Sequence, residues 1–247
     1  MTELAYLANM DEAYRRTFSA TIQALPPGAV VLDRTWFYPA GGGQPADRGT
    51  LTVDGASVPV VDVAKSAGTV LHRIGRGTSG RASGLRLGAA VEGVIDWDRR
   101  QRHMRLHTAQ HLVSAEIFTA TGVRTRRATM GGTEGIVELE SPWPADRPWE
   151  SLVAAVADAV RAALPVAVAW VPRAEWDQAP AARSGLVALP SNVDPVRVIE
   201  IEGHDRCPCG GTHARNTAEL GSIDLPPPKG ATVVLRVAPT AGPTPPA

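Results

Sequence analysis

Residues 99–120, RRQRHMRLHTAQHLVSAEIFTA, form the stretch around which the rest of the chain can be arranged. We expect a helix from about Arg99 to Ala120, with Gly122 as its stop. Its buried side can be formed by Met104, Leu112, Ala115 and Phe118. On such a helix His107 and His111 lie one turn apart on the same face. Two imidazoles in this arrangement can share one tetrahedral ion, so the stretch predicts half of a metal site.

A second pair of ligand-type residues lies far along the chain, in Cys209-Gly-Gly-Thr-His213. A thiolate and an imidazole are good zinc ligands, and sulfur disfavours magnesium or calcium. We therefore predict a zinc ion held by His107, His111, Cys209 and His213, joining the helix to a distant turn. A purely structural zinc remains the alternative to a reactive one. His103 and Cys207 are lower-ranked candidates for the same site.

Two familiar zinc enzyme classes do not fit these motifs. A zincin-type metalloprotease needs a glutamate directly after the first histidine, where this chain has Thr108. A nucleobase deaminase needs His-x-Glu and Pro-Cys-x-x-Cys, whereas Pro208-Cys209 is followed by Gly-Gly-Thr.

Before the helix, short apolar runs separated by Gly, Pro and Asp predict a small antiparallel β-barrel. These runs are 29–32, 49–53, 58–63, 69–74 and 89–95. Residues 11–24 are expected to be helical, with Tyr14, Phe18 and Ile22 on one face. Residues 78–84 are expected to form a loop.

After the helix, the pattern changes to mixed helix and strand. We expect an amphipathic helix over 149–164. Strands are expected over 135–139, 165–171, 195–201, 218–225 and 232–237. The fold class is therefore α+β, with a barrel domain over residues 1–93, an α/β domain over 94–238, and a disordered Pro-rich tail over 239–247.

Composition limits the surroundings in which the chain works. Apolar residues make up 44% of 247, which is typical of a globular protein. No apolar run reaches the roughly 18–20 residues that cross a bilayer, and the N-terminus lacks signal-peptide features. We expect a cytoplasmic protein with no membrane association. Cys207 and Cys209 are too close in sequence for an unstrained disulfide.

Basic and acidic residues balance at 25 each, so net charge gives no support for nucleic-acid binding. Local arginine clusters can still bind phosphates. The candidates are Arg99, Arg100, Arg124, Arg126 and Arg127. A solvated, arginine-rich surface is an equally good interpretation of the clusters.

A glycine-rich segment, Gly41-Gly42-Gly43-Gln44, precedes Pro45. It lacks the Gly-Lys-Ser/Thr of a P-loop, so a tight turn at one end of the barrel is favoured over a phosphate cradle.

Three of these stretches together resemble the editing domain of alanyl-tRNA synthetases and their free-standing relatives, the AlaX-type trans-editing proteins. They are Leu32–Gly49 with its glycines, Asp96–Leu112 with the histidine pair, and Asp205–His213 followed by Thr217–Gly221. They occur in the order of that family, and the resemblance extends over residues 4–237. The barrel and the glycine-rich motif indicate the medium-length class.

The resemblance implies a barrel followed by an α/β editing domain around zinc, and a hydrolase that deacylates tRNA(Ala) mischarged with serine or glycine. Without an aminoacylation domain it should act in trans. In the pocket, backbone N–H groups of Gly210 and Gly211 can stabilise an oxyanion. Thr108 or Thr129 can contact a serine hydroxyl. Thr129 and Glu138 stand where the family often has other polar residues, which leaves amino-acid selectivity open.

Two alternatives remain. Threonyl-tRNA synthetases carry the same zinc motifs and remove serine from tRNA(Thr), although the glycine-rich barrel favours the alanine branch. A zinc-stabilised tRNA-binding module without turnover is the other.

Overall fold

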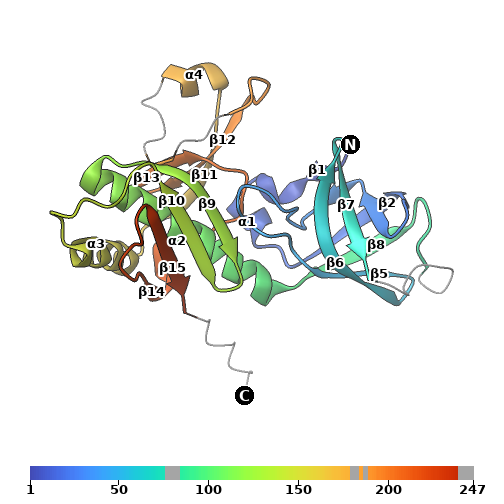
Figure 1. Ribbon diagram of the computed structural model, residues 1–247. Helices are drawn as coiled ribbons and strands as arrows, with labels where there is room; N and C mark the ends of the chain where they lie inside the picture. The colour runs from blue at the N-terminus through green and yellow to red at the C-terminus, as the bar shows by residue number, and fades with distance from the viewer. Residues whose placement is uncertain (76–83, 179–183, 186–188, 239–247) are drawn as a thin grey trace. The chain divides into compact units, whose positions relative to one another are not determined.

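The computed structural model describes residues 1–75, 84–178, 184–185 and 189–238. The chain divides into two compact units, Met1–Gln101 and Arg102–Ala247 (Figure 1). The sequence placed this division after residue 93. The observed boundary comes later because the first turn of helix α2 (Trp97–Thr121) is bonded into the N-terminal unit through Arg100.

The N-terminal unit is built around a closed antiparallel barrel with strand order β2-β3-β7-β6-β5-β8, as the sequence predicted. Its elements are β1 (Glu3–Leu4), η1 (Ala5–Leu7), α1 (Met10–Ala13), β2 (Thr17–Ala24), β3 (Ala29–Leu32), β4 (Arg34–Thr35), β5 (Gly49–Val53), β6 (Ala56–Ser66), β7 (Thr69–Ile74) and β8 (Ala90–Ile95). Alternate strand residues fill its interior, among them Ile22, Leu32, Leu51 and Val63.

The helix expected over residues 11–24 is wrong. Helix α1 has only four residues, and strand β2 begins at Thr17 and takes the segment to Ala24. Phe18, Ala20 and Ile22 are buried while the residues between them are exposed, which is the period of two of a strand. A spacing of four between Phe18 and Ile22 fits this period as well as it fits a helix.

The glycine-rich segment forms a tight turn. Gly41 and Gln44 exchange two backbone hydrogen bonds of 3.1 and 2.9 Å. Gly42 and Gly43 between them have φ of +53° and +82°, which glycine adopts without steric cost. This geometry is that of a two-residue type I′ turn.

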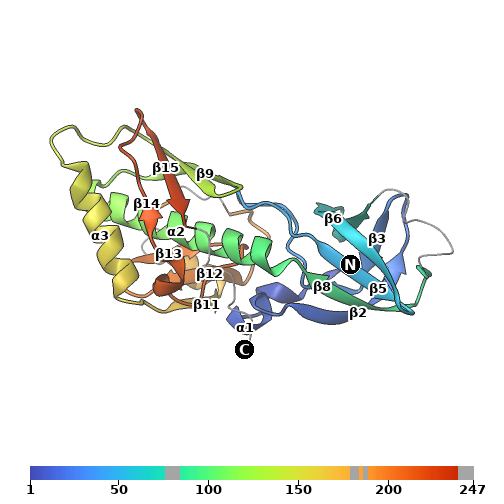
Figure 2. The same cartoon turned by 90° about the horizontal axis from the view of Figure 1, so that it is seen from below.

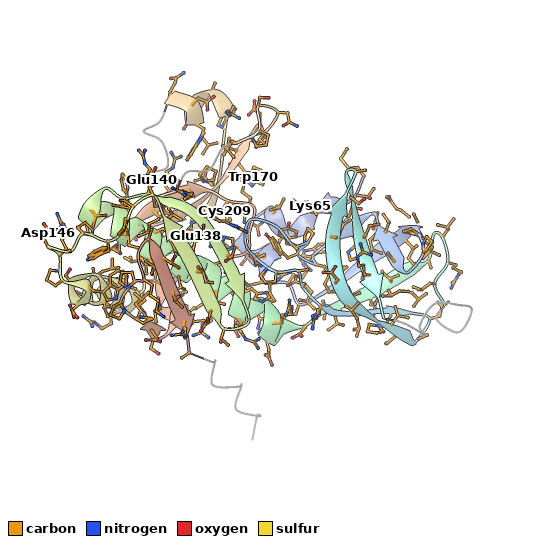
Figure 3. All side chains as sticks on the ribbon, viewed as in Figure 1. Lys65, Glu138, Glu140, Asp146, Trp170 and Cys209 are labelled. Carbon is orange, nitrogen blue, oxygen red and sulfur yellow. The ribbon has the colours of Figure 1, made fainter. Side chains whose placement is uncertain are left out.

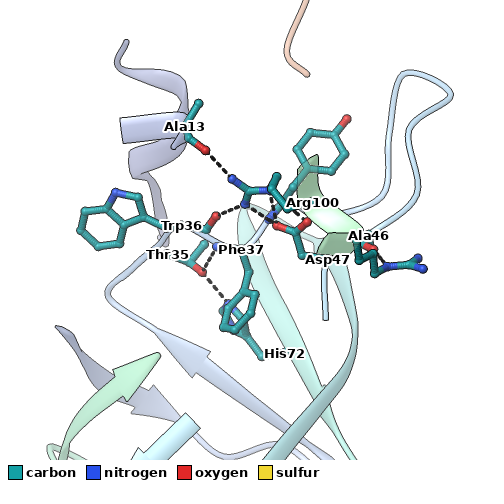
Figure 4. Close-up of polar contacts among 10 residues, drawn as sticks. Ala13, Thr35, Trp36, Phe37, Ala46, Asp47, His72 and Arg100 are labelled. Atoms are coloured by element: carbon teal, nitrogen blue, oxygen red, sulfur yellow. Dashed lines mark hydrogen bonds and ion pairs between the residues drawn. The ribbon is translucent and has the colours of Figure 1, made fainter. Parts of the chain in front are cut away.

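Arg100 is fully buried at the start of α2 (Figure 4). Its Nε donates to both carboxylate oxygens of Asp47 at 3.0 and 2.9 Å, and a second nitrogen makes a further close contact with the same group. Its remaining donors reach the carbonyl oxygens of Ala13 and Trp36 at 2.7 and 2.5 Å. Asp47 also accepts the Tyr38 N–H at 2.6 Å. This network ties α1, the segment after β4 and α2 together.

His72 lies in the barrel interior with no exposed surface (Figure 4). Its Nδ1 donates to the Val30 carbonyl at 3.0 Å, and its Nε2 accepts from the Thr35 hydroxyl at 2.8 Å. Burial lowers the pKa of His72 to about 4, although the hydrogen bond to Val30 opposes the shift. The imidazole of His72 is therefore uncharged in the folded barrel at neutral pH.

This burial predicts a loss of stability in acid. Between pH 6.5 and 4 the unfolded chain binds a proton at His72 and the folded chain does not, so lowering the pH through this window favours unfolding. The His72 contribution should reach about 3 kcal/mol. Urea unfolding of the protein and of His72→Gln at pH 7 and pH 4.5 measures it. The variant should lose less stability between the two pH values; equal losses would contradict the assignment.

The C-terminal unit contains two antiparallel sheets, ordered β14-β15-β10-β9 and β11-β12-β13. Its elements after α2 are β9 (Thr125–Gly131), β10 (Glu134–Leu139), α3 (Trp149–Arg161), β11 (Val166–Val171), α4 (Arg173–Gln178), β12 (Val196–Ile201), β13 (Asp205–Pro208), η3 (Thr217–Leu220), β14 (Ile223–Asp224) and β15 (Thr232–Val237). Figure 2 shows α2 between the two sheets. One apolar core joins Leu106 and Val113 of α2 to Val137, Leu235 and Ile199 of the sheets.

Most of the expected elements of this unit are present, but the strand over 218–225 is wrong in its first part, and only Ile223–Asp224 (β14) within it is a strand. A short 3-10 helix, η3, occupies its first part, because the Asn216 side chain accepts the Glu219 N–H at 3.2 Å and starts a helical turn. Strands β9 and β13 and helix α4 were not anticipated. The expected loop at 78–84 falls largely, and the expected tail over 239–247 wholly, outside the described residues. Within those residues, no helix is both long enough and apolar enough to span a membrane.

Candidate metal centre

Four side chains meet beside α2 in the C-terminal unit. His107 and His111 come from α2, and Cys209 and His213 come from the turn that follows β13. Their ligand atoms all lie within 4.8 Å of one another. Cys209 Sγ lies 3.4 Å from His107 Nε2 and 3.3 Å from His213 Nε2. The two remote motifs singled out in the sequence thus form one group that could hold a metal ion.

The group is enclosed by protein. His107, His111 and His213 expose 2%, 5% and 0% of their surfaces, and Cys209 is half-buried. Three imidazoles and a thiol at this depth need a partner for their polar atoms, because buried polar groups without one are costly. Figure 3 shows the position of Cys209 in this unit.

The charges and hydrogen bonds around Cys209 favour its thiolate form. Burial alone raises the pKa of Cys209, but the neighbouring His107 and the hydrogen bonds from His107 and His111 outweigh burial, and the pKa lies well below its usual value. The Gly211 N–H also donates to Cys209 Sγ at 3.3 Å. Burial and the charge of His107 hold the pKa of His213 well below its usual value. A thiolate and a neutral imidazole are the forms that bind metals.

Outer partners orient two of the imidazoles. His111 Nδ1 bonds the Asp205 carboxylate at 2.9 Å, which leaves Nε2 for the group. The Ser184 hydroxyl donates to the other Asp205 oxygen at 2.7 Å. Burial opposes a charge on His111, but the bonds to Asp205 and Cys209 raise its pKa to about 10, so this position attracts positive charge.

Thr108 orients the second of these imidazoles, that of His213. The Thr108 side chain is fully buried, and its Oγ1 lies 3.1 Å from His213 Nδ1. The same oxygen accepts the Ala214 N–H at 2.9 Å. With Nε2 turned toward Cys209, His213 donates from Nδ1 to Thr108. The hydroxyl that the sequence suggested for a substrate contact is therefore bonded to a ligand-type residue.

The Gly210–Gly211 turn is held by β12. The Cys209 N–H donates to the Arg197 carbonyl at 3.1 Å, and Arg197 Nη1 donates back to the Cys209 carbonyl at 2.5 Å. Gly210 is exposed, and a Cβ placed there would meet nothing within 4 Å. Gly211 is buried and its N–H is bonded to Cys209. The open side of the turn is at Gly210.

A second candidate group overlaps the first. It consists of His111, Asp205 and Cys207, all buried. Burial raises the pKa of Cys207 well above its usual value, with the charges of Asp205 and Cys209 adding to the effect. Cys207 is therefore a neutral thiol, which is the weaker ligand. His103 is fully buried and belongs to neither group in the described part of the chain.

Thr129 and Glu138 lie on the four-stranded sheet. Thr129 pairs with Ile136 and Glu138 with Arg127, whereas the alternate residues Met130 and Val137 enter the core that includes α2. Because side chains alternate along a strand, Thr129 and Glu138 point to the face opposite that core. Both are half-buried there, and their role in a pocket stays a prediction.

The phosphate candidates differ in exposure. Arg126 and Arg127 are exposed on β9, while Arg124 is half-buried with its guanidinium 5.7 Å from the Phe118 ring. Arg99 is half-buried and donates to the Ala46 carbonyl at 2.9 Å. Arg100 cannot reach a phosphate, because it is fully buried with its donors bonded inside the barrel unit. The prediction that Arg100 contacts a phosphate is therefore wrong.

Asp205, Ser184 and Arg197 were missed by sequence reasoning. Asp205 stood within the Cys209 motif, and an acid beside ligand-type residues is a signal for an orienting carboxylate. Ser184 and Arg197 gave no signal, because only the fold brings them to Asp205 and Cys209.

Two family models match the chain. One, described as tRNA synthetases class II (A), matches residues 7–99, and the other, Threonyl and Alanyl tRNA synthetase second additional domain, matches residues 196–227. The second match includes Cys209 and His213. A barrel unit and a site-bearing unit with these matches define a protein of the class related to threonyl- and alanyl-tRNA synthetases.

Relatives that match 91% of this chain identify the family within this class. Alanyl-tRNA editing protein AlaX-M of Methanosarcina acetivorans is 36% identical over 91% of this chain and 92% of its own, and that of Methanosarcina mazei is 35% identical over 91% and 90%. The chain belongs to the AlaX-M family of alanyl-tRNA editing proteins. It is also 36% identical to alanine–tRNA ligase of Methanothrix thermoacetophila, over 86% of this chain and 23% of the ligase.

Proposed function

We propose that this protein is a trans-editing hydrolase that cleaves the ester of mischarged tRNA(Ala), chiefly Ser-tRNA(Ala), with Gly-tRNA(Ala) as a second substrate. The observation that carries the proposal is the meeting of His107, His111, Cys209 and His213 within 4.8 Å in a member of the AlaX-M family. The named relatives are alanyl-tRNA editing proteins, and an editing reaction hydrolyses an aminoacyl ester.

We propose zinc as the metal, because the donor set fits it. Three imidazole nitrogens and one thiolate are ligands of tetrahedral zinc, and sulfur excludes a preference for magnesium or calcium. The Sγ–Nε2 separations of 3.3 and 3.4 Å are close to the ~3.5 Å between neighbouring ligands on a tetrahedron with arms of ~2.0–2.3 Å. When bound, zinc would supply Lewis acidity toward an ester carbonyl or a water molecule.

The protein's own groups hold and orient the site. Asp205 and Thr108 fix the ring orientations of His111 and His213. Arg197 holds the Cys209 backbone, which keeps Gly210 on the open side of the turn where its amide can face an ester oxygen. Exposed Arg126 and Arg127 are the most accessible candidates for phosphate contacts, and Arg99 and Arg124 are half-buried candidates.

Deacylation assays test this function. Ser-, Gly- and Ala-tRNA(Ala) and Ser-tRNA(Thr) are incubated with catalytic amounts of protein, with and without a chelator. We expect multiple turnovers on Ser-tRNA(Ala), slower release from Ala-tRNA(Ala), and loss of both after metal removal. Faster cleavage of Ser-tRNA(Thr) than of Ser-tRNA(Ala) would show that the protein edits tRNA(Thr) instead. Binding of tRNA(Ala) without turnover would show that the protein is a tRNA-binding module and not a hydrolase.

The Asp205 carboxylate should set the strength of metal binding. Replacing Asp205 by asparagine keeps the shape but removes the charge that orients His111, and we expect zinc affinity to fall by about 10- to 100-fold. Ser184→Ala should weaken it less. Competition with a chromophoric chelator measures the affinity, and the cobalt(II) spectrum reports the ligand set.

A matched control is the Glu116 carboxylate, which bonds His204 Nδ1 in the same unit but belongs to no candidate metal group. Glu116→Gln should leave zinc affinity unchanged. Equal affinities for the protein and Asp205→Asn would show that the carboxylate does not support the metal.

A further inference from the structure

The outer surface of the N-terminal barrel carries a hollow of about 600 Å³ across strands β6, β5 and β8. These strands are neighbours in the barrel and can be followed by their labels in Figure 1. All residues that line this barrel hollow belong to the N-terminal unit, whereas the candidate metal centre belongs to the C-terminal unit. The reaction centre proposed above therefore makes no use of the hollow.

One row of outward side chains forms half of the barrel hollow. Thr50 of β5 pairs with Pro59 of β6 on one side and with Val94 of β8 on the other. Directly paired residues of antiparallel strands project from the same face, so these three side chains lie side by side. Val94 is 44% exposed, which places the row on the outside of the barrel.

A second row lies beside the first and is centred on Arg48, which directly precedes β5. Because Gly49 pairs with Val60, the register continued by one residue places Arg48 beside Val61. On the other side of Arg48, the Asp96 N–H donates to its carbonyl at 2.8 Å. Val61 is 44% exposed, and Arg48 and Asp96 are exposed as well. The hollow thus joins an aliphatic floor to one cation and one carboxylate.

The guanidinium of Arg48 is available to an anionic ligand. Among the described residues no carboxylate lies within ion-pair distance of it, whereas Arg15 and Arg86 of the same unit have such partners. The Asp96 carboxylate is turned to the start of α2, where it accepts the Arg99 N–H at 3.2 Å. The positive end of a helix dipole offsets a negative charge at this position. The net effect in the hollow is an unpaired positive charge.

We propose that the barrel hollow binds the sugar–phosphate backbone of the tRNA, an inference that rests on the proposed deacylation of charged tRNA. The Arg48 guanidinium can hold a phosphate through two N–H groups. The apolar side of a ribose packs on Val61 and Val94, and its 2′-hydroxyl donates to an oxygen of Thr50 or Asp96.

The shape and composition of the hollow favour the backbone over a base. The two rows are about 7 Å apart along the strands and extend over two strand spacings of about 4.8 Å, which is room for one nucleotide. None of the lining residues, all of them in the described part of the chain, is aromatic. Stacking on aromatic rings is the usual way in which proteins hold an unpaired base. The contact therefore adds affinity for tRNA without reading its sequence.

Binding of uncharged tRNA(Ala) tests the proposal, because it does not depend on turnover. Arg48→Gln should weaken binding about 10-fold. It should also lower the salt slope, which is the dependence of log Kd on log salt concentration, by about one. Arg48→Lys keeps the charge and should keep the slope. Val61→Glu places a carboxylate in the hollow and should weaken binding at least as much as Arg48→Gln.

Matched controls come from the same unit. Arg86→Gln removes an exposed arginine that is paired with Asp54, and Leu87→Glu adds a carboxylate at a residue that is 68% exposed and outside the hollow. Both should leave Kd and the salt slope unchanged. If Arg48→Gln and Val61→Glu bind tRNA(Ala) as the parent protein does, the proposal is wrong. It is also wrong if sedimentation shows that Val61→Glu splits a dimer of the parent while tRNA binding stays the same.

Deacylation of Ser-tRNA(Ala) separates this proposal from the proposed function. Arg48→Gln and Val61→Glu should raise KM, keep kcat nearly unchanged and keep the bound metal. If the parent protein binds tRNA(Ala) in a way that depends on Arg48 but releases no serine, the proposed function fails and the barrel hollow remains an RNA site. If the parent turns over and both variants keep its KM, the hollow proposal fails alone.

Discussion

Replacing Cys209 by alanine is expected to remove the bound metal and to lower kcat/KM for Ser-tRNA(Ala) by roughly 10³-fold or more, since a bound metal ion contributes several kcal/mol of transition-state stabilisation. Cys209 supplies the only thiol of the four-residue group and, as a thiolate, the negative charge that faces His107 and His213. Without it, three imidazoles face one another with centroids 4.3 to 5.2 Å apart. Single-turnover deacylation, together with metal analysis of the purified protein, measures both losses.

The neighbouring thiol provides the control. Cys207 is buried two residues away, and the second candidate group contains it in place of Cys209. Cys207→Ala should keep the metal and at least most of the activity, because its raised pKa makes it a poor ligand. Loss of metal from Cys207→Ala with retention in Cys209→Ala would reverse the assignment. A Cys209→Ala protein that lacks metal and remains fully active would end the metal-dependent mechanism.

The four residues of the candidate metal centre could be found from the sequence because their chemistry is unusual. Histidines and cysteines are scarce in this chain, and a spacing of four on a helix decides which face they share. Asp205, Ser184 and Arg197 could not be found in the same way. Acidic, hydroxyl and basic side chains occur at many surface positions, and only the packing of β12 and β13 brings these three to the group.

The barrel shows where periodicity alone fails. Tyr14, Phe18 and Ile22 recur at a spacing that is a multiple of two and also close to one helical turn, so the pattern cannot decide between strand and helix. Closure of the barrel decides it, because β2 pairs with both β3 and β8. Strands β5 and β7 were placed correctly, since Gly, Pro and Asp mark their ends in the sequence.

Arginine roles could not be separated by charge counting. Arg99 and Arg100 are adjacent in sequence, yet one is half-buried and the other has no exposed surface. The reason is Asp47, which is 53 residues away in the sequence and faces Arg100 in the folded N-terminal unit. A cluster of basic residues therefore marks both candidate phosphate contacts and structural ion pairs.

Breaking the Arg100–Asp47 pair should give the largest stability effect in the N-terminal unit. Asp47→Asn leaves the Arg100 guanidinium buried without a countercharge, and Arg100→Met leaves the carboxylate with only its remaining contacts, such as the Tyr38 N–H. Removing one member of a fully buried pair typically costs about 3–5 kcal/mol, because the other charge stays desolvated. Urea unfolding followed by tryptophan fluorescence measures the loss, with Trp36 bonded to Arg100 through its carbonyl.

The exposed pair Arg86–Asp54 in the same unit separates burial from charge pairing. Its side chains expose 60% and 65% of their surfaces, so Arg86→Met should cost less than ~1 kcal/mol. The double variant Asp47→Asn, Arg100→Met should recover part of the loss seen in Asp47→Asn alone, because no buried charge is then left uncompensated. Two results would mean that the buried pair does not stabilise the N-terminal unit: additive losses in the double variant, or a loss in Asp47→Asn as small as that in Arg86→Met.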